Sequence, residues 1–423
     1  FMFHMNRQTF RYCFISFFGG YLIMTLEMLG FRLLAPHFGY SIYVFGSLIG
    51  VIMLALAIGY VAGGWFGDRG VRQSRISLIL FCAAGYQVVM RFIYGSLLAA
   101  LAPLPVVAGS LAAAALLFGV PMAALAVLAP YVIKTLVSEQ TVGTGVSAGS
   151  VYAISTVGSI GGTFATAFYL VPEFGAAATL TLAAVGTCAL AVLLAGQARW
   201  RGLALFGVTA VLLVSAPAVP LGDRVIAQAD SVYSTLQVVD YGDFLGLRTN
   251  VREGTVHSYL PKPESGKHFL LYDLFGVPPL VRGGERTLLL GLGAGTLPWL
   301  HRQFGQALDI TAVEIDPKTI ELGYQYFRLG EADNVRIVNE DVRPFLARES
   351  GRYDIIEVDL FQGNGEIPFY VATKEFFELT ARRLTAGGVM AVNIYDPSPD
   401  RRIVSPLLNT ISAVFSYVYF VSA

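Results

Sequence analysis

The first 220 residues are almost entirely apolar, and this constrains the fold of that half more than any other feature. A stretch of about 20 apolar residues is long enough to cross a bilayer as a helix. Such stretches cover residues 10–35, 43–66, 76–101, 104–134, 147–171, 176–197 and 202–220. We therefore predict an α-helical membrane bundle of about seven spans over residues 1–221. The fourth stretch is overlong and contains Pro121 and Pro130, so we expect it to be kinked or broken into two pieces.

Small residues recur in these stretches at a spacing that indicates close helix packing. Gly59 and Gly63, like Gly158 and Gly162, stand four residues apart and so share one helix face. Two backbones can approach closely at such positions, which predicts a compact bundle. The composition agrees with a membrane domain, since 55% of the chain is hydrophobic and only 14% is charged.

Three charged residues, Glu27, Arg32 and Arg91, fall inside the apolar stretches, where charge is costly. Two interpretations stay open for them. The three residues form a polar pocket or path, or Glu27 pairs internally while Arg32 reaches an interface.

Beyond residue 221, charged and hydrophobic residues alternate as in a globular domain. Short β-rich runs at 235–241, 245–251 and 255–260 predict a small antiparallel β subdomain over residues 222–283. In residues 284–423 strands alternate with helices, which predicts a parallel, doubly wound α/β sheet. The expected strands are 287–290, a strand ending at Asp316, 335–339, 353–360 and 388–394, with helices over 317–329 and 373–385.

The α/β half is organised around residues 286–316, which read as strand, glycine turn, helix and strand. Gly291, Gly293 and Gly295 follow the first strand at once, where they allow a tight turn and a close ligand. Glu314 ends the next strand about twenty residues later, where a carboxylate can accept hydrogen bonds from ribose hydroxyls. A plain turn between strand and helix is the alternative, which the flanking strands and Glu314 disfavour.

Acidic residues gather at the predicted strand ends. Glu314, Asp316, Asp341 and Asp359 all stand at or just beyond such ends, where parallel sheets bind ligands. The balance of 29 Lys and Arg against 29 Asp and Glu gives no reason to expect a nucleic acid partner. The three cysteines lie in apolar runs without CxxC or histidine spacing, so we expect neither disulfides nor a metal site.

These residues carry a resemblance to a known family. The motifs are GLGAG at 291, VEIDP at 313, NED at 339, VDLF at 358 and IPFYVATKEFF at 367, with EMLGFRLLAPHFG at 27 and YAISTVGSIGGT at 152. With them the chain resembles the membrane-fused branch of the spermidine synthase (polyamine aminopropyltransferase) family. The resemblance implies a class I methyltransferase-like (Rossmann-like) fold for the C-terminal half, which would bind S-adenosylmethionine or its decarboxylated form.

The resemblance also implies roles for single residues. The 291–295 turn would hold the nucleoside and its tail, Glu314 the ribose and Asp341 the adenine amino group. Asp359 would be the catalytic carboxylate that deprotonates or positions the attacking amine. Tyr272 and Gln362 would bind the acceptor substrate.

Two positions depart from the family pattern. Soluble synthases carry an Asp in the glycine turn, which holds the amine of decarboxylated S-adenosylmethionine, and here Ala294 takes that position. They carry a second Asp three residues beyond the strand-end Asp, which grips the diamine, and here it is Gln362. A hydrogen bond to a charged group contributes about 1.5–3 kcal/mol, so conversion of putrescine is disfavoured.

Two functions remain open at this stage. The first is a transferase that passes an aminopropyl, aminocarboxypropyl or methyl group to an unidentified small-molecule acceptor. The second is a non-catalytic membrane transporter-like or assembly subunit with a relic nucleoside-binding domain. We expect a multi-pass protein of the cell (inner) membrane, in contact with the lipid bilayer and forming a homo-oligomer or part of a larger membrane assembly.

Two signals conflict over the side of the membrane on which the C-terminal half lies. Basic residues mark the loops near 7–11, 69–75 and 199–201 as cytoplasmic, and with seven spans this places the C-terminal half outside. A nucleoside made in the cytosol argues for the inside. We favour the cytoplasm, which requires the fourth stretch to cross twice or one stretch to be re-entrant.

The end of the chain gives a further expectation. Residues 403–414 read as a helix and 415–421 as a β-rich strand, after which no residues remain for a seventh strand between its neighbours. The terminal strand would then lie beside a gap with unpaired backbone groups. We therefore expect the natural chain to be longer than this sequence, or another subunit to cover this edge.

Overall fold

The computed structural model describes residues 7–421, except 40, 139–142, 196–223, 250–255, 264, 267–269, 284, 333, 362–366, 397–399 and 401. The chain divides into two compact units, Phe1–Pro220 and Leu221–Ala423.

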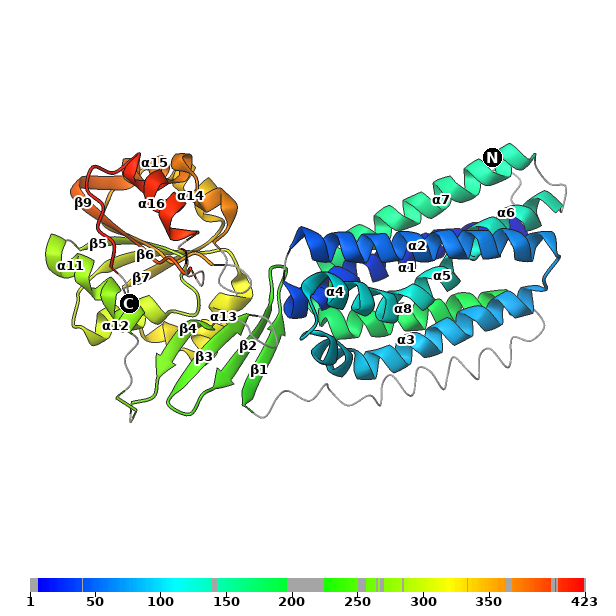
Figure 1. The fold of residues 1–423 in the computed structure, drawn as a ribbon, viewed down its shortest axis with the longest axis horizontal. Coiled ribbons are helices and arrows are strands. Elements are labelled where there is room, and N and C mark those ends of the chain that lie inside the picture. Colours follow the sequence, from blue (N-terminus) through cyan, green and yellow to red (C-terminus); the bar gives the residue numbers. More distant parts are fainter. Residues whose placement is uncertain are drawn as a thin grey trace. The chain divides into compact units, whose positions relative to one another are not determined.

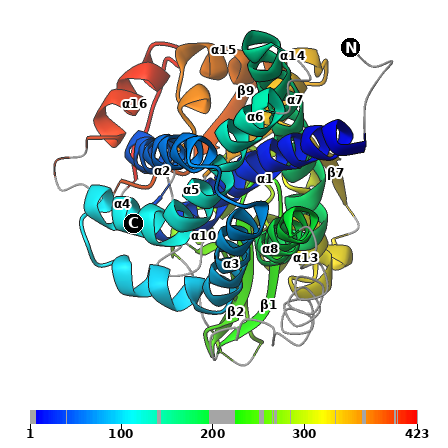
Figure 2. The same cartoon turned by 90° about the vertical axis from the view of Figure 1, so that its right-hand side faces the viewer.

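The N-terminal unit is a bundle of helices in which α1 (Arg7–Phe38) contacts most of the others (Figures 1 and 2). The further helical segments are α2 (Ile42–Asp68), α3 (Gln73–Leu101), α4 (Val106–Ala114), η1 (Ala115–Gly119), α5 (Val120–Ala126), α6 (Leu128–Ser138), α7 (Thr144–Ala165), η2 (Thr166–Phe174) and α8 (Gly175–Leu194).

Five helical stretches in the described part of this unit are long and apolar enough to cross a membrane. They are Arg7–Phe38, Ile42–Asp68, Gln73–Leu101, Val106–Ser138 and Thr144–Leu194. The last stretch has 51 residues, and Gly175, with a φ of 80° and a ψ of 167°, interrupts its helical backbone. Two of the expected spans thus fall in this one stretch. The expected span at 202–220 lies outside the described residues, so the number seven stays a prediction.

The fourth stretch is irregular at its two prolines. The π-helical turn η1 ends two residues before Pro121, and the helix is interrupted at Val127, three residues before Pro130. Proline lacks a backbone N–H and clashes with the preceding turn, so local departures from α-helix are expected at both places. The stretch stays one helical run with local distortions.

Glycines allow the helices of the bundle to touch through their backbones. A Cβ atom at Gly158 of α7 would overlap the carbonyl oxygen of Phe17, and one at Gly162 would overlap that of Tyr21. At Gly59 and Gly63 of α2 the overlap would be with backbone carbonyls of the α5–α6 region. The close approach predicted from the four-residue spacing is therefore confirmed at both pairs.

The C-terminal unit begins with an antiparallel sheet of order β1-β2-β3-β4. Its strands are β1 (Val225–Asp230), β2 (Thr235–Asp240), β3 (Phe244–Thr249) and β4 (Val256–Pro261). The sequence analysis did not predict β1.

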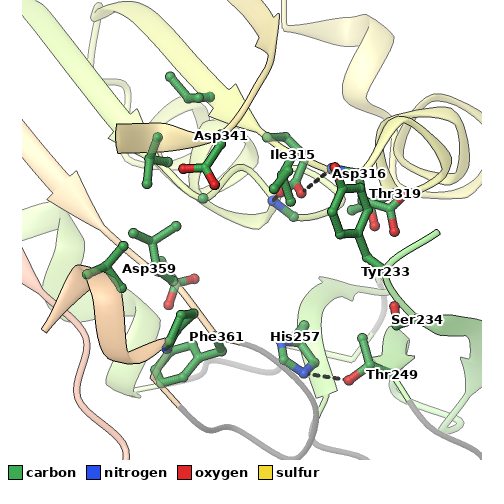
Figure 3. Close-up of a pocket in the computed structure, with 18 of the residues that line it drawn as sticks. Tyr233, Ser234, Thr249, His257, Ile315, Asp316, Thr319, Asp341, Asp359 and Phe361 are labelled. Carbon is green, nitrogen blue, oxygen red and sulfur yellow. Dashed lines mark hydrogen bonds between the residues drawn. The ribbon is translucent and has the colours of Figure 1, made fainter. Parts of the chain in front are cut away.

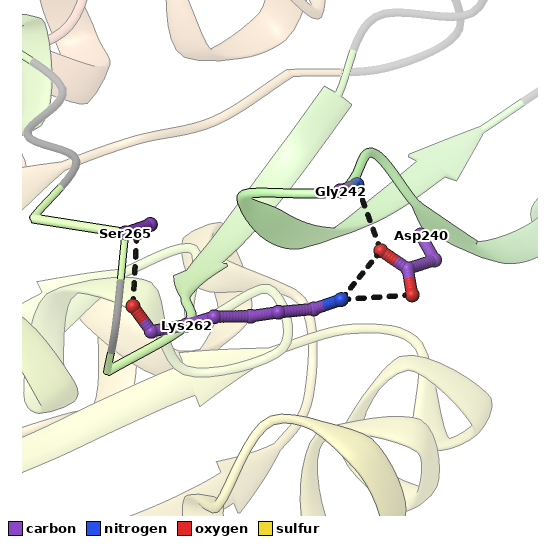
Figure 4. A network of polar contacts seen from close by, with 4 residues as sticks. All are labelled: Asp240, Gly242, Lys262 and Ser265. Carbon is purple, nitrogen blue, oxygen red and sulfur yellow. Dashed lines mark hydrogen bonds and ion pairs between the residues drawn. The ribbon is translucent and has the colours of Figure 1, made fainter.

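A polar network ties the β2–β3 turn to the segment after β4 (Figure 4). The carboxylate of Asp240 accepts the N–H of Gly242 at 2.8 Å and pairs with the Lys262 ammonium at 2.9 Å, while the Ser265 hydroxyl donates to the Lys262 carbonyl.

A second, parallel sheet of order β7-β6-β5-β8-β9 forms the centre of this unit. Its strands are β5 (Arg286–Leu290), β6 (Asp309–Glu314), β7 (Val335–Asn339), β8 (Tyr353–Val358) and β9 (Leu384–Val392). The helical segments around it are α10 (Leu270–Asp273), η4 (Leu274–Gly276), α11 (Val277–Arg282), α12 (Thr296–Gln303), α13 (Pro317–Tyr326), η5 (Leu329–Glu331), α14 (Val342–Arg348), η6 (Phe369–Val371), α15 (Lys374–Arg383) and α16 (Val404–Ser412).

The central strands β6, β5 and β8 are buried on both faces of the sheet, so most of their residues are apolar. Leu288 and Leu290 pack in one core with Phe376 of α15, whereas Leu289 packs in another with Leu300 of α12. Strand order reverses between β5 and β8, and such a switch point is where α/β sheets bind ligands.

The strand expected at 415–421 is a wrong prediction. This segment follows α16 without entering a ladder, and in the described structure β9 is the last strand of the sheet. Tyr417 and Tyr419 are 84% and 88% exposed, so burial does not hold their segment in a strand. The aromatic and β-branched composition alone suggested a strand, but a strand forms only where its backbone pairs with a neighbouring strand.

We predict that Gly162→Ala lowers the free energy of unfolding by about 1–3 kcal/mol, because the added methyl forces α7 away from α1. Thermal unfolding of the purified full chain measures the effect. Gly161→Ala is the matched control, since its Cβ would meet nothing closer than 3.8 Å. Equal melting temperatures for the two variants would contradict close α1–α7 packing.

Candidate functional site

A pocket of about 250 Å³ lies in the C-terminal unit, where the parallel sheet meets the antiparallel one (Figure 3). The carboxyl ends of β5, β6 and β8 form one side of it, through Gly291, Glu314 and Asp359. Thr249 of β3 and His257 of β4 lie on the other side.

The glycine turn after β5 has no room for a side chain at Gly291 or Gly293. Gly291 and Gly293 have φ values of 94° and 56°, in the left-handed region that favours glycine. A Cβ at Gly291 would overlap the carbonyl oxygen of Asp359, and one at Gly293 would lie 2.5 Å from the Ser258 hydroxyl. Both glycines line the pocket, and neither position has room for a Cβ.

Glu314 ends β6 with its carboxylate held by the backbone. Its oxygens accept the N–H of Gly293 at 2.8 Å and the N–H of Asp316 at 3.0 Å. Burial raises the pKa of Glu314 to about 7, although these amide hydrogen bonds favour the charged form. The carboxylate is thus fixed beside the glycine turn.

Two further acids of the pocket cap helices. Asp341 accepts the N–H of Arg343 at 2.9 Å at the start of α14, and Asp316 accepts that of Lys318 at 3.0 Å at the start of α13. Asp316 also accepts the Ser231 hydroxyl at 2.5 Å, which links it to the turn between β1 and β2. The main contacts of Asp316 are therefore structural.

Asp359 follows β8 and is positioned by side chains from neighbouring segments. The Asn393 amide, just after β9, donates to its carboxylate at 2.9 Å. Burial raises the pKa of Asp359 to about 6, while the interactions with Asn393 and the Tyr272 hydroxyl lower it. The charge of Glu357, two residues earlier, also raises this pKa.

A buried pair lies behind Asp359. The Nε2 atom of His301 is 3.0 Å from the Glu357 carboxylate, and its Nδ1 atom is 2.6 Å from the side-chain oxygen of Gln306. Burial opposes a charged imidazole, but the hydrogen bond and charge of Glu357 raise the pKa of His301 above its ordinary value. The pair holds α12 against β8 at the base of the site.

The structure brings most of the predicted site residues together. Those that line the one pocket are Gly291, Gly293, Glu314, Asp341 and Asp359. Gly295 instead starts α12, with a φ of 104°. Tyr272 is buried, and its hydroxyl donates to the His257 carbonyl at 3.4 Å. Gln362 lies outside the described residues.

Sequence reasoning missed two polar side chains, His257 and Asn393. Asn393 lies near the end of the strand predicted at 388–394, at the same sheet edge as the acids, so the strand-end rule extended to amides finds it. His257 lies within a short antiparallel strand, and only the packing of that strand against the glycine turn brings it to the pocket. Ala294 is fully buried in an apolar cluster with Leu236 and Leu322, so its side chain adds nothing polar to the site.

Comparison with known proteins agrees with this arrangement. Residues 295–423 match the family model of the spermine/spermidine synthase domain. The probable polyamine aminopropyl transferase of Bifidobacterium longum is 35% identical over 190 residues, which cover 44% of this chain and 42% of the relative. The polyamine aminopropyltransferase of Mycobacterium tuberculosis is 30% identical over 304 residues, which cover 63% of this chain and 55% of the relative.

The chain therefore spans about half the length of these two curated relatives. Among solved structures, the spermidine synthase of Thermotoga maritima is 17% identical with a TM-score of 0.38, covering 46% of this chain and 65% of the other. The C-terminal part of the chain is a spermine/spermidine synthase domain with homologues among the polyamine aminopropyltransferases.

Proposed function

We propose that the C-terminal unit binds S-adenosylmethionine or its decarboxylated form and transfers an aminopropyl, aminocarboxypropyl or methyl group to a small-molecule acceptor. The observation that carries this is the Glu314 carboxylate, fixed by backbone amides beside a glycine turn without room for a Cβ. Such a cradle fits a nucleoside with a ribose diol at Glu314. The acids of the pocket also complement a sulfonium cation.

The reacting end of the site depends on Asp359. The sulfonium, when bound, supplies an activated carbon. The protein therefore mainly orients the acceptor and takes up one proton from it. Asp359 is charged above about pH 6 and is held by Asn393, so it can accept a hydrogen bond from an acceptor amine or hydroxyl. Ala294 offers no carboxylate in the glycine turn to hold the amine of the decarboxylated nucleoside, which disfavours conversion of putrescine.

We also propose that the N-terminal unit anchors this chemistry in the cell (inner) membrane, with the C-terminal unit in the cytoplasm. Large apolar side chains point outward from its helices, such as Ile42 at 81%, Val61 at 75% and Phe168 at 73% exposure. An apolar exterior of this kind suits lipid contact. The proposed partners are the bilayer, the acceptor, and further copies or subunits of a membrane assembly.

We expect Glu314→Gln to weaken binding of S-adenosylmethionine about ten- to hundred-fold, because the neutral glutamine amide accepts hydrogen bonds from the ribose less strongly than the glutamate carboxylate does. Calorimetry on the detergent-solubilised full chain measures this. Glu321→Gln is the matched control, since Glu321 is exposed on α13 and pairs with Lys318. The proposal fails if the wild-type chain binds neither sulfonium nucleoside at millimolar concentration.

We expect Asp359→Asn to change how stability depends on pH. The folded carboxyl keeps its proton to about pH 6, whereas its ordinary pKa is 3.8. The folded state therefore binds more protons than the unfolded state in this window, and the free energy of unfolding falls as pH rises from about 4 to 6.

Asparagine cannot ionise, so it avoids the cost of burying a charge. The free energy of unfolding of Asp359→Asn should therefore exceed that of wild type by about 1–2 kcal/mol at pH 7.5, and by less at pH 4.5. Chemical denaturation at the two pH values measures it. Asp309→Asn, at the exposed start of β6, serves as the control. A gain of the same size at both pH values would show that the carboxyl is not desolvated.

A further inference from the structure

Strand β4 is tied to the glycine turn by side chains from both segments. The Ser258 hydroxyl accepts the N–H of Ala294 at 2.8 Å. One residue further, the Thr296 hydroxyl oxygen accepts the N–H of Tyr259 at 2.7 Å and donates to its carbonyl at 3.1 Å. These bonds fix the preceding residue, His257, beside the turn.

His257 is the extra residue of a β-bulge. In the β3–β4 ladder Leu247 pairs with Ser258 and Arg248 with Val256, so the register shifts at His257. A bulge bends its strand and re-aims a side chain. The Thr249 hydroxyl lies 2.7 Å from the Nε2 atom of His257, and the Phe361 ring lies with its centroid 6.4 Å from the imidazole. Figure 3 shows the imidazole on the opposite side of the pocket from Asp341.

The pocket has an uneven distribution of charge. Among its described lining residues Glu314, Asp316, Asp341 and Asp359 can be negative, and His257 alone can be positive. S-adenosylmethionine and its decarboxylated form differ only in the carboxylate of the tail. A site that accepts the first form therefore needs a donor where that carboxylate lies.

We propose that His257 binds the tail carboxylate of S-adenosylmethionine and makes this site select it over the decarboxylated nucleoside. A charge-assisted hydrogen bond from the imidazole favours the carboxylate. The apolar, buried Ala294 places no opposing carboxylate in the glycine turn. The inference rests on the proposed function and specifies the donor that this pocket takes.

The test compares three nucleosides by calorimetry on the full solubilised chain. S-adenosylmethionine and its decarboxylated form report on the tail, and 5′-methylthioadenosine, which lacks the tail charges, reports on the adenosine end. Wild type should bind S-adenosylmethionine at least about tenfold more tightly than the decarboxylated form. His257→Gln should lose about tenfold of that preference and keep its affinity for methylthioadenosine within about twofold. Thr249→Ser, which retains the hydroxyl, should keep the preference.

Three results would overturn the inference. They are a wild-type preference for the decarboxylated form, an unchanged preference in His257→Gln, and a parallel loss of methylthioadenosine affinity in that variant. The last would show that His257 shapes the pocket and does not recognise the tail. Failure of wild type to bind methylthioadenosine would overturn the proposed function as well, so the two failures are distinguishable.

Discussion

The site depends on the contact between the ends of β5 and β8. The N–H of Asp359 donates to the Leu290 carbonyl at 2.9 Å, and the Asp359 carbonyl lies where a Cβ of residue 291 would be. Glycine at 291 therefore lets the two strand ends lie side by side at the switch point of the sheet. The glycine turn and the carboxylate of Asp359 then face the same pocket, although 68 residues separate Gly291 from Asp359 in the sequence.

The grouped acids of the pocket carry an energetic cost. The pKa values of Glu314 and Asp359 are raised to about 7 and 6 because the folded chain removes their carboxyls from water. A fold selected for stability alone would replace such groups, so their presence is typical of a functional site. A bound cation offsets part of this cost, since each carboxylate gains a nearby opposite charge.

Local patterns predicted most of the α/β half, because each parallel strand is a short apolar run bounded by turns. The strand at 335–339 agrees with β7 to the residue, and the acids at strand ends followed from the fold rule. His257 was beyond such reasoning, because its position comes from a bulge and from contacts between distant segments. The strand expected at 415–421 failed for the related reason that a strand depends on a partner.

Glycine serves one physical purpose in both units, with a spacing set by the local backbone. In α7, Gly158 and Gly162 recur every four residues because one face of a helix must meet the carbonyls of α1. After β5, Gly291 and Gly293 recur every two residues because the chain turns sharply against two different neighbours, Asp359 and Ser258. The same lack of a Cβ that lets two helices touch in the bundle thus lets the turn after β5 pack against Asp359 and Ser258 beside the pocket.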